Sequence, residues 1–451
     1  MSGAMTEQQS GPGLFSRRYA ALTGGLFALC AFVAFEATAV VTIMPGVAAE
    51  LQGIRFYSLV FAAPLASGVV GMVVAGGWSD RSGPIGPLAA SLVLFSAGLV
   101  GCGLAPSMQV LIAARVVQGL GGGALTVCLY VLVGLTYPPW LRPAVFWSFS
   151  AAWILPTLFG PALAAYVAQA VGWRWVFLGV VGLVVVAAAG ISPSLRGLDA
   201  PTSGTRFPWS RLACAGVGAI AVLALQLLGS RPDPMAALTV VAAAVLLLAI
   251  RPLLPSGTLR AAPALPAVIA TRALLSGAFF CGEAYVVFVL QQRWGLSAGI
   301  AGLALTGVGL SWSAASWAQS RLSRTTSDRA AMRIGSAAVL AGILGLALLV
   351  WVHAPAPVAA AAYVLAGAGM GFAYPRTSVA MLAESGDSDR GFNSAALSIA
   401  DALGGATTIA ASGAVFTAVQ RTAGDPFVAA LAVGCVAGLL AVVTSARTHA
   451  A

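Results

Sequence analysis

The chain has 451 residues, which is long enough for about three soluble domains, but 59% of them are hydrophobic and only 8% are charged. This composition excludes soluble domains, because their surfaces need polar residues. The formal net charge of +10 does not indicate nucleic-acid binding, since the 23 basic residues are all Arg and lie mostly singly between apolar runs. With a mean hydropathy of +0.94, the chain is predicted to be an all-α integral membrane protein, because unpaired backbone groups are too costly in lipid.

Apolar runs divide the chain from end to end. A helix that crosses a hydrocarbon core of roughly 30 Å needs about 20 residues. Fourteen segments qualify, and they are expected to start near residues 20, 56, 87, 108, 144, 173, 210, 235, 264, 298, 332, 357, 391 and 426. We assign residues 1–19 to an N-terminal tail, 20–192 to a six-helix bundle, 193–263 to a linker with two extra transmembrane helices, 264–445 to a second six-helix bundle and 446–451 to a C-terminal tail.

The distribution of Arg predicts the orientation, because basic residues gather in cytoplasmic connecting segments. Of the 23 Arg, fifteen lie on the side of the N-terminus, five lie on the opposite side (Arg55, Arg174, Arg231, Arg293 and Arg421) and three lie within helices (Arg115, Arg272 and Arg376). Both tails are therefore expected in the cytoplasm. The protein is expected to work as a monomer in the plasma or inner membrane.

The two six-helix segments match each other at nearly one spacing. At an offset of 248, Ser79-Asp80-Arg81 falls on Ser327-Asp328-Arg329, and the glycines at 119, 121 and 123 fall on those at 367, 369 and 371. At 247, Glu36 falls on Glu283. Because so few residues are charged, these coincidences indicate an internal duplication of the kind from which transporters are built. The glycine runs are expected to let helices pack closely and slide.

Four short segments carry the most informative motifs: Gly76-Gly77-Trp78-Ser79-Asp80-Arg81-Ser82-Gly83, Arg115-Val116-Val117-Gln118-Gly119, Gly160-Pro161, and Glu36-Ala37-Thr38-Ala39-Val40 through Pro45. Together they resemble motifs of the major facilitator superfamily, specifically of its fourteen-span drug:proton antiporter family. The resemblance implies a fold of two six-helix repeats with two inserted helices, and a proton-coupling role for Arg115. It also implies gating roles for Gly76, Asp80, Arg81, Gly83, Gln118, Gly119, Gly160 and Pro161 and, through the repeat, for Asp328 and Arg329.

Charged residues inside the membrane persist mainly where function or pairing compensates for their cost. Glu36 and Arg115 lie at similar depths, roughly 13 and 9 Å from the outer ends of their helices at 1.5 Å per residue, so they can meet. A carboxylate binds a proton more tightly in apolar surroundings than beside a cation. A pair that separates during transport therefore changes its proton affinity, and Glu36 is predicted to be a proton-binding carboxylate. The alternative is a static ion pair.

Two further carboxylates lie in predicted spans. Glu283 is interpreted as a second proton site or as a counter-charge for a cationic substrate, against a neutral carboxyl that hydrogen-bonds neighbouring helices. Asp401, near mid-membrane, is a candidate for proton coupling, against a neutral Asp bonded to Ser398 or Thr408 on its own helix. Arg272 and Arg376 lie nearer the cytoplasmic ends of their helices and are expected to extend to the interface.

Aromatic residues are candidates to line an apolar cavity between the halves, together with Arg376; the alternative for most of them is contact with lipid or neighbouring helices. They are Phe32, Phe35, Trp153, Phe279, Tyr285, Phe288 and Trp312. No nucleophile and base pair, metal cluster or phosphate loop suggests an enzyme, and no cofactor is expected beyond the proton as coupling ion. The predicted function is proton-driven export of small apolar or amphipathic molecules. The alternatives are export of a lipid or glycolipid, and a membrane sensor or scaffold without transport.

Overall fold

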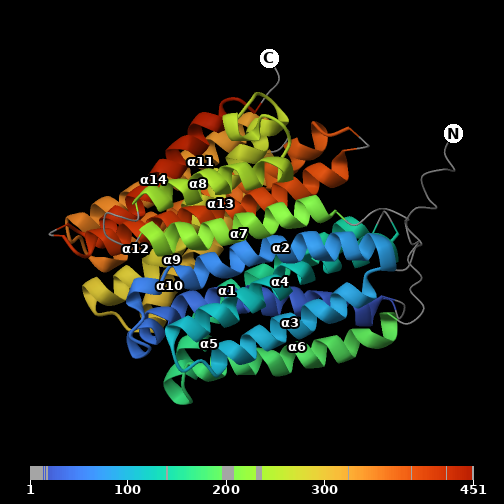
Figure 1. Ribbon diagram of the computed structural model, residues 1–451, viewed down its shortest axis with the longest axis horizontal. Coiled ribbons are helices and arrows are strands. Elements are labelled where there is room, and N and C mark those ends of the chain that lie inside the picture. The colour runs from blue at the N-terminus through green and yellow to red at the C-terminus, as the bar shows by residue number, and fades with distance from the viewer. Residues whose placement is uncertain are drawn as a thin grey trace.

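The computed structural model describes the chain apart from residues 1–13, 15, 17–18, 139–140, 196–207, 230–235, 323–324, 387–388, 423 and 449–451. The described part is helical, without strands (Figure 1). Its α-helices are α1 (Ala20–Glu50), α2 (Leu59–Ser82), α3 (Ile85–Gly103), α4 (Met108–Thr136), α5 (Arg142–Ala170), α6 (Arg174–Leu195), α7 (Trp209–Gly229), α8 (Ala236–Ile250), α9 (Leu265–Trp294), α10 (Ala298–Arg321), α11 (Asp328–Trp351), α12 (Ala356–Ala383), α13 (Arg390–Val419) and α14 (Pro426–Ser445). The prediction of an all-helical membrane protein is confirmed.

Every helix starts within four residues of its predicted start. Within the described residues, 13 helices are long and apolar enough to cross a membrane, whereas the apolar helix at Leu238–Leu253 is shorter. This segment consists of α8 from Leu238 onward and a turn of 3-10 helix at Arg251–Leu253. Pro252 lies in that turn, where its missing N–H and its ring oppose continuation of the α-helix.

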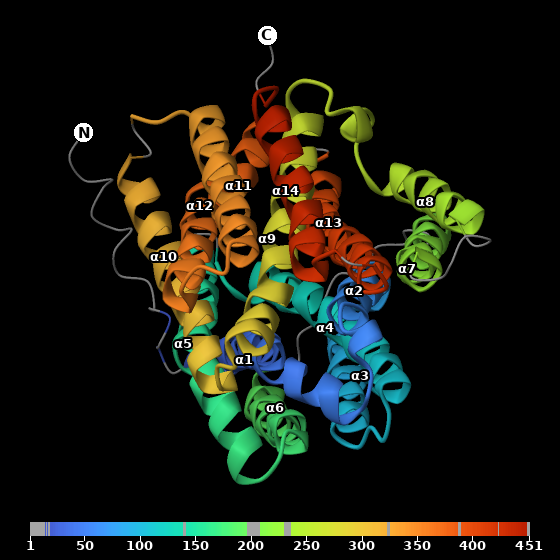
Figure 2. The same cartoon turned by 90° about the vertical axis from the view of Figure 1, so that its left-hand side faces the viewer.

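The same packing pattern occurs in the first and the last six helices. In the first set, α4 packs against α2 and α3, α1 against α5 and α6, and α3 against α6. In the last set, α12 packs against α10 and α11, α9 against α13 and α14, and α11 against α14. The two halves meet where α2 lies beside α13 and where α5 lies beside α10, while α7 lies beside α2 and α13 and carries α8 at the periphery (Figure 2).

The repeated glycines explain how the helices of each half approach so closely. A Cβ at Gly123 would lie under 3.0 Å from the carbonyl oxygen of Gly68 in α2, and one at Gly371 would lie equally close to that of Trp312 in α10. Gly121 turns to the next face of α4, where a Cβ would overlap the backbone of α3. Glycines at alternate positions therefore let one helix contact two neighbours through backbone atoms, in the manner of small-residue motifs of membrane helices.

The two halves are joined at the end of the bundle where α1 and α9 finish. The Tyr57 hydroxyl donates to the carbonyl oxygen of Ala284 at 2.8 Å, and the Tyr57 ring stacks on Phe288 with centroids 4.3 Å apart. The side-chain amide of Gln291 donates to the carbonyl oxygen of Thr42 at 3.3 Å. These contacts close this end of the interface between the halves, which is the outer end in the orientation expected from the Arg distribution.

Candidate functional site

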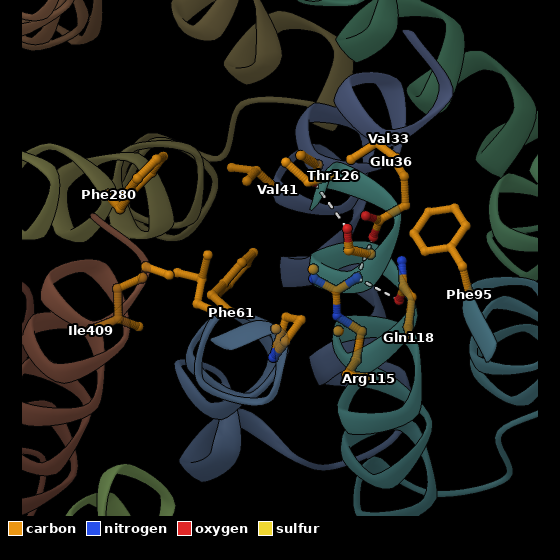
Figure 3. Close-up of a pocket in the computed structure, with 18 of the residues that line it drawn as sticks. Val33, Glu36, Val41, Phe61, Phe95, Arg115, Gln118, Thr126, Phe280 and Ile409 are labelled. Atoms are coloured by element: carbon orange, nitrogen blue, oxygen red, sulfur yellow. Dashed lines mark hydrogen bonds and ion pairs between the residues drawn. The ribbon is translucent and has the colours of Figure 1, made fainter. Parts of the chain in front are cut away.

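A buried polar network joins α1 and α4 near the middle of the first half. The guanidinium of Arg115 forms an ion pair with Glu36, and the same nitrogen, Nη1, donates to Oε1 of Gln118 at 2.7 Å. Its Nε donates to the carbonyl oxygen of Val60 in α2 at 3.0 Å. Figure 3 shows the Arg115 side chain pointing toward both Glu36 and Gln118. The predicted meeting of Glu36 and Arg115 is present.

Burial makes this network energetically significant. Glu36, Arg115 and Gln118 are 7%, 5% and 1% exposed. Taking two charges out of water is costly, and their attraction repays that cost only where the remaining donors also find partners. The amide of Gln118 and the carbonyl of Val60 supply those partners to Arg115. Glu36 in α1 is therefore linked to Arg115 and Gln118 in α4 and, through Arg115, to the backbone of α2.

The network forms one wall of a cavity of about 240 Å³ that both halves line. Ligand pockets usually measure about 300–1,000 Å³, so this cavity suits a small ligand in the present conformation. Phe61, Phe280 and Ile409 lie on the side away from the polar network (Figure 3). The full lining is Val33, Glu36, Ala37, Val41, Phe61, Pro64, Leu65, Gly68, Met72, Phe95, Arg115, Gln118, Gly119, Gly122, Gly123, Thr126, Trp153, Phe280, Glu283, Ala284, Ala402 and Ile409.

The cavity collects some of the predicted site residues and leaves others elsewhere. Of the aromatic residues expected to line it, only Trp153 does so. Four lie in ring clusters inside the second half or at the closed end, where Phe279 packs edge-on against Trp312 at 5.2 Å and Phe288 and Tyr285 pack against Phe416 at 5.8 and 5.5 Å. Phe32 and Phe35 are partly buried against the core. Packing within the bundle, the alternative given above, thus describes these six residues.

Sequence reasoning overlooked Phe61, Phe280 and Thr126, which do line the cavity. The available signal was the helical spacing of Phe280 from Glu283, which places two residues three positions apart on one face of α9. Thr126 follows Gly122 by one turn of α4 and donates to its carbonyl oxygen at 3.0 Å. Such a local bond leaves no trace in hydropathy.

A second buried network joins α9, α12 and α13, and it corrects the expectation for Arg272. Arg272 is 7% exposed and does not extend to the interface; its Nε donates to Asp401 at 2.7 Å and its Nη1 to Oγ1 of Thr377 at 2.8 Å. Asp401 also accepts hydrogen bonds from Ser276 and, at 3.1 Å, from the hydroxyl of Tyr374. Its partners therefore come from other helices, unlike in the alternative weighed above, a neutral Asp bonded to Ser398 or Thr408 on its own helix. Pairing inside the bundle neutralises both charges where three helices converge.

Arg376 likewise does not extend to the interface and does not line the cavity. It is 7% exposed and forms an ion pair of 2.6 Å with Asp328 in the first turn of α11. A carboxylate in the first turn also interacts favourably with the helix dipole. This pair links α11 to α12 at the end of the bundle opposite the closed one.

The other motif residues lie at helix ends or contacts. Asp80 and Arg81 are exposed in the last turn of α2, which Gly83 ends with φ of +78°, and Arg329 is exposed. Gly76 has open space where a Cβ would be. A Cβ at Gly160 would lie 2.8 Å from Oγ1 of Thr38 in α1, and Pro161 lies against Gly302 of α10. The Gly160-Pro161 step therefore touches both halves.

Known proteins resemble this chain over most of its length. The Major Facilitator Superfamily model matches residues 26–409. A probable multidrug-efflux transporter of Mycobacterium tuberculosis is 28% identical over 444 residues, 91% of each chain, and Multidrug resistance protein 3 of Bacillus subtilis is 32% identical over 144 residues, 32% of this chain and 28% of that one. A D-xylose-proton symporter structure has a TM-score of 0.68 at 14% identity and covers 95% of this chain and 98% of its own, which shows the shared fold. The chain therefore belongs to the Major Facilitator Superfamily and is a multi-pass membrane transporter.

Proposed function

We propose that this transporter exports small apolar or amphipathic molecules in exchange for protons, by alternating access of the central cavity. One observation carries the proposal: the buried Glu36–Arg115 pair lies on the wall of a cavity that both halves line. A proton acceptor and a bound molecule in the same cavity can each influence the other. The direction of transport rests on the similarity to proteins named multidrug-efflux transporters.

Glu36 is the proposed proton acceptor. Protonation would remove its charge and weaken the ion pair, while Arg115 would keep its hydrogen bonds to Gln118 and to the carbonyl oxygen of Val60. Because a carboxylate beside a cation holds a proton less tightly than a carboxylate alone in apolar surroundings, separation of α1 from α4 would favour proton uptake. Re-formation of the pair would then release the proton.

Alternating access requires the halves to part at one end and to close at the other. The Tyr57–Ala284 and Gln291–Thr42 hydrogen bonds closing one end support this mechanism, because they are few enough to break and re-form. In this proposal the protein works as a monomer in the cell membrane with both termini in the cytoplasm. It needs no cofactor apart from the proton.

The test is transport by the purified protein in liposomes, driven by a pH gradient and measured with a panel of dyes, drugs and fluorescent lipids. We expect gradient-dependent movement of small amphipathic dyes. Movement of the lipids alone would instead identify a lipid exporter, and no gradient-dependent movement of any compound would indicate a sensor or scaffold.

Glu36→Gln tests the proton site within the same assay. This variant is expected to lose the gradient-dependent component while it still binds dye. Glu50→Gln is the matched control, because Glu50 lies on the same helix in an exposed ion pair of 3.0 Å with Arg174. If Glu36→Gln kept full gradient-driven transport with an unchanged pH dependence, Glu36 would not be the coupling carboxylate.

A further inference from the structure

The duplication places equivalent residues in the two halves, but it does not give them the same charges. Glu283 stands at the position of Glu36 with an offset of 247, and Tyr363 stands at the position of Arg115 with an offset of 248. The second half therefore has the carboxylate without the cation. Tyr363 is fully buried, and its hydroxyl donates to the carbonyl oxygen of Phe279 at 2.7 Å.

Glu283 consequently has no cationic partner in its own half. The Tyr363 ring packs against Gly282, the chain neighbour of Glu283, but a neutral phenol supplies no counter-charge. Within the described part of the chain, Glu283 forms no ion pair and no side-chain hydrogen bond. Arg272, the buried cation of α9, is already paired with Asp401.

Glu283 nevertheless lines the same central cavity as the polar network of the first half. The charged residues of that lining are Glu36, Arg115 and Glu283, so the cavity carries one carboxylate in excess. Phe61, Phe280 and Trp153 contribute apolar surface to the same cavity. An uncompensated carboxylate in such surroundings is costly, and a ligand that brings one positive charge on an apolar body removes that cost.

We propose that Glu283 pairs with the positive charge of the transported molecule, so that the cavity selects amphipathic monocations. A single excess carboxylate matches a single charge, and a second cationic group would meet Arg115. Aromatic rings next to the carboxylate further stabilise a cation that lies against their faces. The inference deepens the proposed function, since it rests on the cavity being the substrate site.

The test is equilibrium binding in detergent micelles without a proton gradient. The probes are a dansyl dye with a trimethylammonium-ethyl tail and the same dye with the isosteric, uncharged 3,3-dimethylbutyl tail. The wild-type protein is expected to bind the cationic dye more tightly. Glu283→Gln should weaken binding of the cationic dye roughly 30-fold or more, as expected when one partner of a buried charge pair is removed, and should change binding of the uncharged dye less than about twofold.

Two further variants keep the result interpretable. Glu283→Asp retains the charge and should retain the preference for the cationic dye, and Glu50→Gln should bind both dyes like the wild type. Equal weakening of both dyes by Glu283→Gln, or no weakening of either, would overturn the assignment. Binding in micelles needs no proton gradient, so a failure of proton coupling would appear only in the liposome assay. The binding result therefore tests the role of Glu283 independently of proton coupling.

Discussion

Arg115→Met is expected to destabilise the folded protein strongly, because it leaves Glu36 buried without its cation. Arg115 forms the ion pair with Glu36 and two further hydrogen bonds, to Gln118 and to the carbonyl oxygen of Val60. Removing one member of a buried ion pair costs about 3–5 kcal/mol of unfolding free energy. Glu36→Gln should cost less, about 1–3 kcal/mol, because Arg115 keeps its other two partners and the new amide oxygen can still accept.

The double variant Glu36→Gln/Arg115→Met distinguishes a coupled pair from two independent sites. Its loss of stability should be smaller than the sum of the single losses by about 0.5–3 kcal/mol. The reason is that Arg115→Met alone leaves the Glu36 carboxylate buried without a partner, whereas the double variant has no carboxylate at that position. The measurement is unfolding in mixed dodecyl maltoside and SDS micelles, followed by tryptophan fluorescence. Additive losses would show that Glu36 and Arg115 do not stabilise each other, and the coupling mechanism would lose its basis.

Three other predictions concern packing, the second network and orientation. Gly123→Ala should lower the free energy of unfolding by about 1–3 kcal/mol, because its Cβ would overlap a carbonyl oxygen of α2. Gly134→Ala is the control on the same helix; its Cβ would meet open space, so it should be neutral or stabilising. Equal effects of the two substitutions would contradict the close approach of α4 to α2. Asp401→Asn should cost about 1–3 kcal/mol in the same unfolding assay, because Arg272 loses its counter-charge but keeps its hydrogen bonds to Thr377 and to the carbonyl oxygen of Tyr374, and a loss under about 1 kcal/mol would refute a structural role. Orientation can be tested in whole cells with a variant that lacks the native cysteines and carries one new cysteine in place of an exposed Arg. A membrane-impermeant maleimide should label a cysteine in place of Arg421 from outside, but one in place of Arg81 only after lysis. The reverse pattern would invert the assigned orientation.

The fold was largely predictable because lipid leaves a membrane protein few choices. Apolar length alone located every helix, since each span must satisfy its own backbone hydrogen bonds. The exception is α8, whose apolar run continues into Arg251–Leu253 but whose regular helix ends at Ile250. Hydropathy does not register the constraint of a proline on the backbone, so the run looked longer than the α-helix it forms.

The site was less predictable, because sequence gives depth along a helix but not the face that meets a neighbour. Depth was used to pair Glu36 with Arg115, and that pair is present. The same arithmetic places Arg272 and Asp401 roughly 10 and 16 Å from the starts of their helices at 1.5 Å per residue. A long Arg side chain bridges that difference in depth, but the contact between α9 and α13 depends on the tertiary structure and cannot be read from the sequence. Without it, extension to the interface was the simpler expectation for Arg272.

The two halves share their backbone packing but divide their polar chemistry. Close contact between helices depends on absent side chains, so glycines recur at the fixed offset, as Gly123 and Gly371 do. Charged residues need not recur at the same offset, because each half needs ion pairs only where they stabilise its own helices. The second half pairs Arg272 with Asp401 away from the cavity lining, whereas the first half pairs its charges on the cavity wall. In the proposed mechanism, protonation of Glu36 would therefore disturb helix contacts in the first half, while Glu283 in the second half would stay available to a ligand.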